Sequence, residues 1–426
     1  MDGNMRKKIA IIGSGTSGLI TALAFDESLD KEKYEFVVYE RMADVGGLWN
    51  FSEDVGLDSF DGLPVHGPMY KNLITNGPNE LAELGFTEYF KGNEQGYVNQ
   101  EIYLKSFFQF AEEYDLYKYI KCRHYIKSVK KTANGFALEI LNTVTKETLF
   151  ENFNFVIVAA GRYNVPKWPN AETELLKEFG GECFHSKDIK DTNKYNNKRV
   201  LCIGSGFSAL DIGLLLHKAG APLVIINGKP GLLTNNCTYS WEQNFKMVLS
   251  PLKSVNEKRI TFEDGSSDEF DCVIMCTGFL CEFPFLEDQL QPVNNNSIFP
   301  HLYEAIFDIE HPQLMFVGAL YTFLPKIFAY LQGHFICNIL NDDMRNLPNK
   351  TQMEEAIQAW YSQIPTGSDL GPFLQFHYDH YYKLQEVCPR KVLDKRYERL
   401  LSYNLKSLFA GTHSEKIDKG LNDFDY

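Results

Sequence analysis

The sequence lacks the features by which proteins bind charged polymers and membranes. Its 56 acidic residues outnumber its 42 basic ones, giving a formal net charge of −14, and no basic block interrupts the chain. This balance opposes binding to nucleic acid or anionic lipid. No apolar run is long enough to cross a membrane, and residues 1–8 are too polar for a signal peptide. We therefore expect a cytoplasmic protein with no nucleic-acid partner and no membrane anchor, secreted only if a signal peptide was removed from this numbering.

The chain also lacks disulfide, metal and repeat patterns. Its nine cysteines are scattered, and several lie in apolar, strand-like runs such as residues 200–203. This placement favours reduced, buried thiols. We find no nucleophilic triad, metal-ligand cluster, solenoid period, low-complexity tract or heptad pattern, so no metal is expected. The 426 residues, 44% of them hydrophobic, can bury a large core and predict two or three domains.

What the sequence does contain is a dinucleotide-binding pattern near its start. A β-branched run at residues 8–12 precedes Gly-x-Gly-x-x-Gly at residues 13–18. An apolar helical run at 19–25 follows, and then a second strand-like run at 36–40 that ends in Glu40. Strand, glycine turn, helix and acid-terminated strand together predict a βαβ unit that binds a dinucleotide.

Each residue type in this pattern has a physical role. Gly13 permits the tight turn, Gly15 lets the backbone approach a pyrophosphate, and Gly18 lets the helix pack closely on the strand. The helix N-terminus supplies oriented N–H groups to the phosphates. Glu40 accepts hydrogen bonds from an unphosphorylated ribose.

The same plan recurs after a proline-bearing connector at residues 165–169. A strand at 199–203 leads into Gly-x-Gly-x-x-Ala at 204–209 and a helix, and the next strand ends in Asn227, Gly228 and Lys229 instead of an acid. A neutral residue with a nearby lysine accepts the 2′-phosphate that an acid would repel. This second site therefore suits NADP(H), although Lys229 could equally be an exposed loop lysine.

Two nucleotide folds joined in this way predict an α/β flavoprotein. We expect two Rossmann-like domains, each with a small antiparallel meander, with the NADPH domain inserted into the FAD domain. The Asn134-Gly135 turn marks the first meander, and residues 259–276 form the second. We place the FAD domain at 1–165, the NADPH domain at 166–290 and the returning FAD segment with C-terminal helices at 291–426. Helices are expected near residues 99–119, 326–340 and 352–361.

From Ile9 to about Leu340, this chain resembles the flavin-containing monooxygenases. The likeness includes both glycine fingerprints, the Gly-Gly-Leu-Trp sequence at residues 46–49 and the Cys-Thr-Gly-Phe link at 276–279. Residues 179–189 are similar to the family's Phe-x-Gly-x-x-x-His-x-x-x-aromatic pattern, with Ile189 in place of the final aromatic. We interpret His185 in this motif as a structural hydrogen-bonding residue rather than a proton donor.

The resemblance implies a mechanism. NADPH reduces FAD, O₂ adds to form a C4a-hydroperoxyflavin, and a tertiary amine or sulfide takes one oxygen atom. It also implies that Asn76 is catalytic, lying beside the flavin. Because it lacks an apolar C-terminal anchor, the chain resembles insect, yeast or bacterial members of the family. An alkaloid substrate is compatible with an insect-like member. Whether the protein forms a homodimer is left open. The candidate cofactor-binding residues are Gly13, Ser14, Gly15, Thr16, Ser17, Gly18, Glu40, Arg41, Gly47, Leu48, Trp49, Thr75, Asn76, Gly161, Gly204, Ser205, Gly206, Phe207, Ser208, Lys229, Thr277, Gly278 and Gln332.

Several alternatives stay open at this stage. A Baeyer–Villiger ketone monooxygenase shares the two folds, as does a dinucleotide-binding redox sensor without turnover. A disulfide reductase is disfavoured because Cys276 and Cys281 follow the second meander instead of lying early in the first domain. Asn76 could instead cap a helix, Trp49 could belong to the core, and Gln332 could serve helix packing.

Overall fold

The computed structural model describes residues 5–84, 86–91, 97–229, 242–292, 299–364, 370–393 and 395. The chain divides into two compact units. The first contains the described parts of Met1–Asn50, Thr75–Arg162 and Cys281–Ser402, and the second contains Phe51–Ile74 and the described parts of Tyr163–Leu280. Residues 51–74 thus group with the second unit, whereas the domain boundaries after 165 and 290 remain a prediction.

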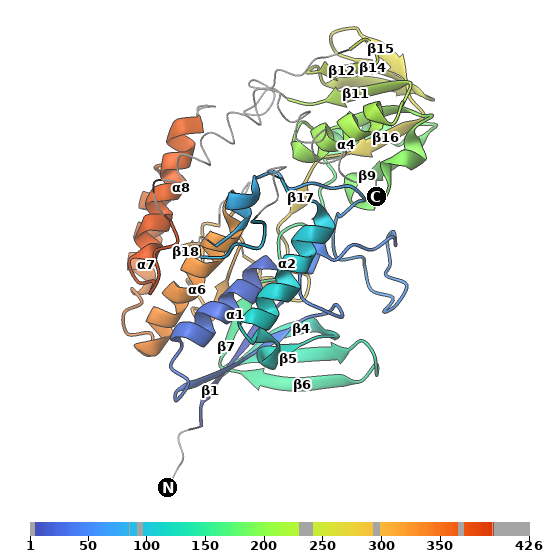
Figure 1. The fold of residues 1–426 in the computed structure, drawn as a ribbon. Coiled ribbons are helices and arrows are strands. Elements are labelled where there is room, and N and C mark those ends of the chain that lie inside the picture. The colour runs from blue at the N-terminus through green and yellow to red at the C-terminus, as the bar shows by residue number, and fades with distance from the viewer. Residues whose placement is uncertain are drawn as a thin grey trace. The chain divides into compact units, whose positions relative to one another are not determined.

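The first unit is built on a seven-stranded sheet (Figure 1). Neighbouring strands in the segment β20-β7-β1-β2-β3 are all parallel, as a βαβ unit requires, and the strands β19 and β18 continue it antiparallel. In sheet order the strands are β18 (Leu302–Tyr303), β19 (Phe307–Asp308), β20 (Leu314–Phe316), β7 (Phe155–Val158), β1 (Lys7–Ile12), β2 (Tyr34–Tyr39) and β3 (Ile120–Lys121).

Two helices far apart in the sequence pack closely in this unit, α1 (Thr16–Ser28) and α6 (Pro325–Asn341). A Cβ atom at Gly333 of α6 would lie only 2.7 Å from the Cβ of Ala24 in α1, so glycine permits their close approach. Both helices are largely buried. The predicted helix at 326–340 is confirmed, and it brings the C-terminal part of the chain onto the first βαβ unit.

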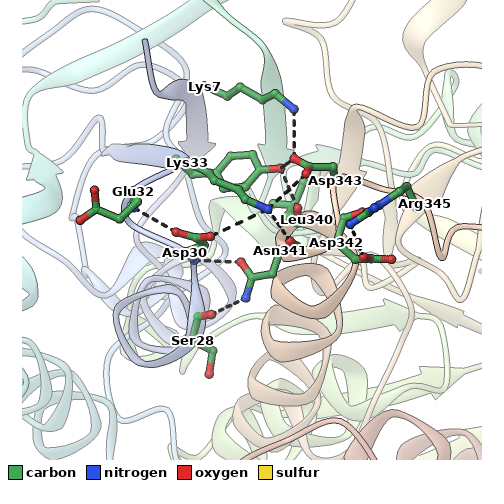
Figure 2. Close-up of polar contacts among 11 residues, drawn as sticks. Lys7, Ser28, Asp30, Glu32, Lys33, Leu340, Asn341, Asp342, Asp343 and Arg345 are labelled. Atoms are coloured by element: carbon green, nitrogen blue, oxygen red, sulfur yellow. Dashed lines mark hydrogen bonds and ion pairs between the residues drawn. The ribbon is translucent and has the colours of Figure 1, made fainter. Parts of the chain in front are cut away.

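A polar cluster joins the C-terminal ends of α1 and α6, as Figure 2 shows. The Asn341 side-chain amide donates to the carbonyl of Ser28 (2.7 Å) and accepts from the N–H of Asp30 (2.8 Å). Lys33 Nζ donates to the carbonyl of Asn341 (2.9 Å) and pairs with Asp343 (3.1 Å). These contacts satisfy backbone groups that helix ends leave open, and thereby hold α6 in register along α1.

Among the other helices of the unit, α7 (Lys350–Tyr361) confirms the prediction at 352–361, and α2 (Gln100–Glu113) corrects another prediction. The helix expected at 99–119 is α2, capped by the Asn99 side chain, followed by a separate 3₁₀ turn. It ends early because Asp115 has a φ of 50°, which a helix cannot contain. The remaining helices are η1 (Gly47–Trp49), η2 (Asn79–Ala82), η3 (Leu116–Tyr119), η6 (Asp288–Leu290), α7 (Lys350–Tyr361) and α8 (Leu370–Gln385).

The predicted first meander is confirmed as the antiparallel sheet of β4 (His124–Thr132), β5 (Gly135–Asn142) and β6 (Thr148–Phe153). Its turn places Gly135 at a φ of 139°, which glycine tolerates. Val129, Phe136 and Leu138 of this sheet are buried in one core cluster with the apolar face of the seven-stranded sheet. The meander therefore packs on the first fold as part of its core.

The second unit holds a fully parallel five-stranded sheet. In sheet order its strands are β12 (Phe245–Val248), β11 (Leu223–Asn227), β10 (Arg199–Ile203), β16 (Cys272–Met275) and β9 (Glu182–His185), and α4 (Phe207–Lys218) follows β10. Its shorter elements are β8 (Val165–Pro166), α3 (Asn170–Leu176), η4 (Ser186–Asp188), η5 (Thr192–Tyr195) and β17 (Phe279–Leu280).

The second meander differs from its prediction. An antiparallel sheet is present, but it consists of β13 (Leu252–Asn256), β14 (Arg259–Phe262) and β15 (Ser267–Glu269). The run expected to continue it to residue 276 contains β16, which joins the parallel sheet instead. The physical reason is burial, because all four residues of β16 are buried, as strands covered on both faces are.

Candidate functional site

The first glycine loop connects β1 to α1 and has the expected geometry. Gly13 has a φ of 99°, and its N–H donates to the carbonyl of Tyr39 at the end of β2 (2.8 Å). A Cβ at Gly18 would lie 1.8 Å from the carbonyl oxygen of Gly13. Glycine is therefore required at both positions, for the turn and for the close packing of the helix. The N-terminus of α1 has no side-chain cap, which suits an anion-binding end.

Gly15 faces a second glycine loop. A Cβ at Gly15 would lie 3.3 Å from the Cα of Gly47, and one at Gly47 would lie 2.7 Å from the Cα of Gly15. The N–H of Gly46 donates to the carbonyl of Ser14 (3.1 Å). The loop from Gly46 to Trp49 thus lies flat on the glycine turn. The sequence predicted Gly15 only as the point where the backbone approaches a ligand, and this second contact is an addition.

Glu40 is buried at the end of β2 and is tied to the same turn. Its Oε2 accepts from the N–H (2.8 Å) and the hydroxyl (2.9 Å) of Ser14, and its Oε1 accepts from the N–H of Met42 (2.8 Å). A carboxylate offers about four acceptor positions, so a further hydrogen bond from a ribose hydroxyl is compatible with these three. The predicted ribose acceptor also stabilises the glycine loop.

Trp49 is half-buried and packs on an aromatic residue of α2. Its ring centroid lies 4.2 Å from that of Tyr103, and its carbonyl accepts from the Gln100 side chain (2.5 Å). The neighbouring candidate Arg41 lies over the ring of Tyr125, 5.7 Å from its centroid. The position of Trp49 is therefore set by its contacts with α2.

Thr75 and Asn76 lie in one turn, in which the Thr75 side chain is buried and the Asn76 side chain is exposed. The Thr75 hydroxyl donates to the carbonyl of Gly77 (2.9 Å) and accepts from the N–H of Val98 (3.1 Å), so it fixes the turn. Asn76 is exposed. The following helix, η2, has Pro78 at its N-cap position, and the alternative that the Asn76 side chain caps this helix stays a prediction.

Gln332 lies fully buried in α6 and bonds to two backbone segments. Its side-chain oxygen accepts from the N–H of Gly318 (3.0 Å), and its side-chain nitrogen donates to the carbonyl of Ala305 (3.3 Å). A Cβ at Gly318 would lie 2.1 Å from the Ser17 hydroxyl. The sequence predicts that a returning strand ending in glycine at Gly318 closes this site, but it does not predict the contact of Gly318, two residues after β20, with the first turn of α1. These contacts favour a packing role for Gln332, and its contact with a cofactor stays a prediction.

The second glycine loop, between β10 and α4, repeats the turn with more space. Gly204 has a φ of 126°, and a Cβ there would lie 2.1 Å from the carbonyl of Cys276. Gly206 precedes α4, which begins at Phe207 and has neither a side-chain cap nor an acid in its first turn, and a Cβ at Gly206 would meet nothing within 4 Å. This helix end can therefore accept a phosphate.

The end of β11 carries no acid, as predicted. The Asn227 side chain is buried and donates to the carbonyls of Val248 (3.0 Å) and Ser250 (2.8 Å). Lys229 is exposed, and its carbonyl accepts from the Ser205 hydroxyl (3.3 Å). The second loop therefore presents a lysine where the first loop has the buried Glu40.

His185 has the structural role that its motif predicts. Its Nδ1 accepts from the N–H of Lys187 (3.1 Å), which leaves Nε2 to donate to the carbonyl of Gly278 (3.0 Å). Burial lowers the pKa of His185 to about 4, so the imidazole is neutral at pH 7. Ile189 is fully buried in the core cluster that includes Tyr70, so an aliphatic side chain fills the place of the expected aromatic.

Two other kinds of site are absent from the described part of the chain. No group of His, Cys, Asp or Glu residues there could hold a metal ion. No helix among those residues combines the length and apolar character needed to cross a membrane. The candidate chemistry thus rests on the two glycine loops and their surroundings.

In both sheets a glycine loop leads from one parallel strand into a helix, which defines the class as a protein with two dinucleotide-binding folds. A family model described as flavin-binding monooxygenase-like matches residues 6–250 and 243–381. The chain belongs to this family, and it is a flavin-dependent monooxygenase.

Individual relatives agree with this assignment. Trimethylamine monooxygenase from Methylocella silvestris is 33% identical over 73% of this chain and 69% of its own length. Senecionine N-oxygenase from Tyria jacobaeae is 29% identical over 84% of this chain and 75% of its own. The crystal structure of Tmm from Pelagibacter sp. strain HTCC7211 has a TM-score of 0.83 at 26% identity, covering 96% of this chain and 91% of that one.

Proposed function

We propose that this protein N-oxygenates a tertiary amine, using FAD, NADPH and O₂. The observation that carries the proposal is the contrast between the two folds, in which a buried acid ends β2 and a buried amide ends β11. One oxygen atom of O₂ is added to the nitrogen lone pair of the amine. The other leaves as water, whose two hydrogens and two electrons come from the hydride of NADPH and one further proton.

FAD is assigned to the first fold and NADPH to the second. Glu40 suits the unphosphorylated ribose of FAD, and its negative charge would repel a 2′-phosphate. At the second fold, Lys229 supplies positive charge for that phosphate. The flavin supplies the oxygen-transfer chemistry when bound. The residues in both glycine loops fit these groups, because the ends of α1 and α4 carry no side-chain cap.

The chain's own residues have three tasks. The N-termini of α1 and α4 bind the pyrophosphates through backbone N–H groups. Gln332 holds Gly318 against Ser17 and so shapes the first site. The Asn76 amide, exposed beside the turn that Thr75 fixes, donates a hydrogen bond to negative charge that develops on oxygen.

The choice of an amine rests on similar proteins named for trimethylamine and senecionine. A sulfide is the competing soft nucleophile, and an alkaloid amine is the larger substrate to try. We also propose a reducing compartment such as the cytoplasm. The described cysteines support this, since all of them are free thiols.

The test measures NADPH oxidation by purified, FAD-loaded protein with trimethylamine, dimethyl sulfide or cyclohexanone, and identifies products by mass spectrometry. We expect an N-oxide in amounts that match the NADPH consumed. An ester from the ketone, with no N-oxide, would replace the proposal by a Baeyer–Villiger activity. Binding of both cofactors without any turnover would indicate a redox sensor instead.

A further inference from the structure

Lys326 is a buried cation that forms no hydrogen bond or ion pair with the described residues. It lies in the first turn of α6, and only 6% of its surface is exposed. Its ammonium lies 5.6, 4.8 and 5.3 Å from the ring centroids of Phe90, Tyr103 and Phe107. The charge thus faces three aromatic rings, an arrangement known to attract cations.

This charge is unfavourable for folding. Burial lowers the pKa of Lys326 to about 8, and Glu83 opposes that shift only through its field. A buried charge without a hydrogen-bonded partner destabilises a protein, and an apolar side chain of similar size is often more stable there. Stability alone therefore does not explain a lysine at this position, whereas a role in the function of the site does.

The aromatic rings connect Lys326 to the first glycine loop. Tyr103, the ring nearest the ammonium, lies against Trp49 with 4.2 Å between ring centroids. Trp49 ends the loop in which Gly47 contacts the backbone of Gly15. A continuous series of contacts thus runs from the start of α6, through α2, to the turn that opens α1.

We propose that Lys326 is a positioning residue, whose ammonium holds the Tyr103 ring and thereby keeps the Gly46–Trp49 loop against the first glycine turn. The inference rests on the proposed binding of FAD at that turn. Neutralising the ammonium removes the attraction for the ring while leaving the aromatic cluster in place. The loop is then less well fixed, and FAD affinity falls.

The test compares the dissociation constant of FAD, measured by flavin fluorescence, for wild type, Lys326→Met and Lys326→Arg. We expect Lys326→Met to weaken FAD binding about tenfold, the order of one desolvated cation–π contact. Arginine keeps the charge and restores most of the affinity. Lys105→Met is the matched control, since Lys105 is an exposed lysine on the helix that carries Tyr103, and it leaves the affinity unchanged.

A pH series separates the charge from simple packing. Glu83 and Tyr103 are the other ionisable groups acting here; burial and the Glu83 field both raise the pKa of Tyr103, so it stays neutral. Wild-type affinity for FAD should fall as the pH rises through about 8, and the Lys326→Met profile should lack this step. A Met variant with wild-type affinity, or an Arg variant as weak as Met, would overturn the inference. A wild type that binds no FAD would overturn the proposed function instead.

Discussion

Gly15 and Gly47 lie backbone to backbone, with so little space that a Cβ at Gly15 would lie 3.3 Å from the Cα of Gly47. At the corresponding position of the second loop, a Cβ at Gly206 would meet nothing within 4 Å. The two folds thus share a spacing of glycines but differ in what surrounds the middle one.

This difference predicts opposite outcomes for the same substitution. Gly15→Val forces the two glycine loops apart, an overpacking that costs about 1–3 kcal/mol, and should yield colourless or unfolded protein. Gly206→Val fits the fold and should keep FAD, but its side chain blocks the phosphate and slows flavin reduction by NADPH about 100-fold. Flavin absorbance and stopped-flow reduction measure both effects. The reverse pattern would exchange the two cofactor assignments.

Lys229→Ala should narrow the preference for NADPH over NADH. Loss of a charge-assisted contact to the 2′-phosphate weakens NADPH binding by about 1.5–3 kcal/mol, while NADH has no such phosphate to lose. The measurement is the ratio of kcat/KM for the two nucleotides. Lys253→Ala, at an exposed lysine of the same unit, serves as the control. An unchanged ratio in Lys229→Ala would make this residue an ordinary surface lysine.

His185 should make the protein less stable as the pH falls. Its pKa is about 4 in the fold, against an ordinary value of 6.5, so between these values the unfolded chain binds more protons. The stability is fully present above pH 6.5 and is lost as the pH falls toward 4. Linkage gives a loss of about 2 kcal/mol from this group between pH 7.5 and pH 5.

Urea unfolding of wild type and His185→Gln at these two pH values checks the prediction. The variant should be less stable at pH 7.5, because glutamine cannot reproduce both backbone contacts of His185, yet lose less stability on acidification. A variant that loses as much stability as wild type would show that His185 is not the titrating group.

The sequence predicts most of the framework because its signals are local. Strand, glycine turn and helix follow one another within about 30 residues, so the spacing alone indicates both parallel folds. The predicted end of the second meander is wrong because a local signal does not identify the sheet that a strand joins. The apolar run at 272–275 has the composition of a strand in either kind of sheet, and only burial on both faces decides which one it joins.

The parts of the site that could not be predicted depend on contacts between distant segments. Gly318 meets Ser17 across 300 residues of sequence, and Lys326 meets rings from two other segments. From the sequence alone, a lysine within an apolar helical pattern is predicted to be a surface residue that interrupts the apolar face. Nothing local indicates that α6 turns this side chain inward, since that follows from its packing on α1.

Asn76 is the residue that should decide whether oxygen reaches the substrate. Its amide can donate to a developing negative oxygen and accept from a hydroxyl or amide at the same time, which neither Asp nor Leu can do. We expect Asn76→Asp and Asn76→Leu to retain FAD and reduction by NADPH, yet to release hydrogen peroxide instead of oxygenated product. Because Asn76 is exposed, either substitution should lower stability by no more than about 1 kcal/mol, which is what the loss of a helix cap costs.

The decisive measurement is hydrogen peroxide released per NADPH consumed, with trimethylamine present. Glu80→Gln, an exposed polar change four residues away, is the matched control and should remain coupled. Aspartate should uncouple at least as strongly as leucine, because it places a negative charge where negative charge develops on oxygen. If both Asn76 variants give the wild-type ratio of product to peroxide, this amide belongs to the scaffold and the group that stabilises the oxygen must be sought elsewhere around Thr75.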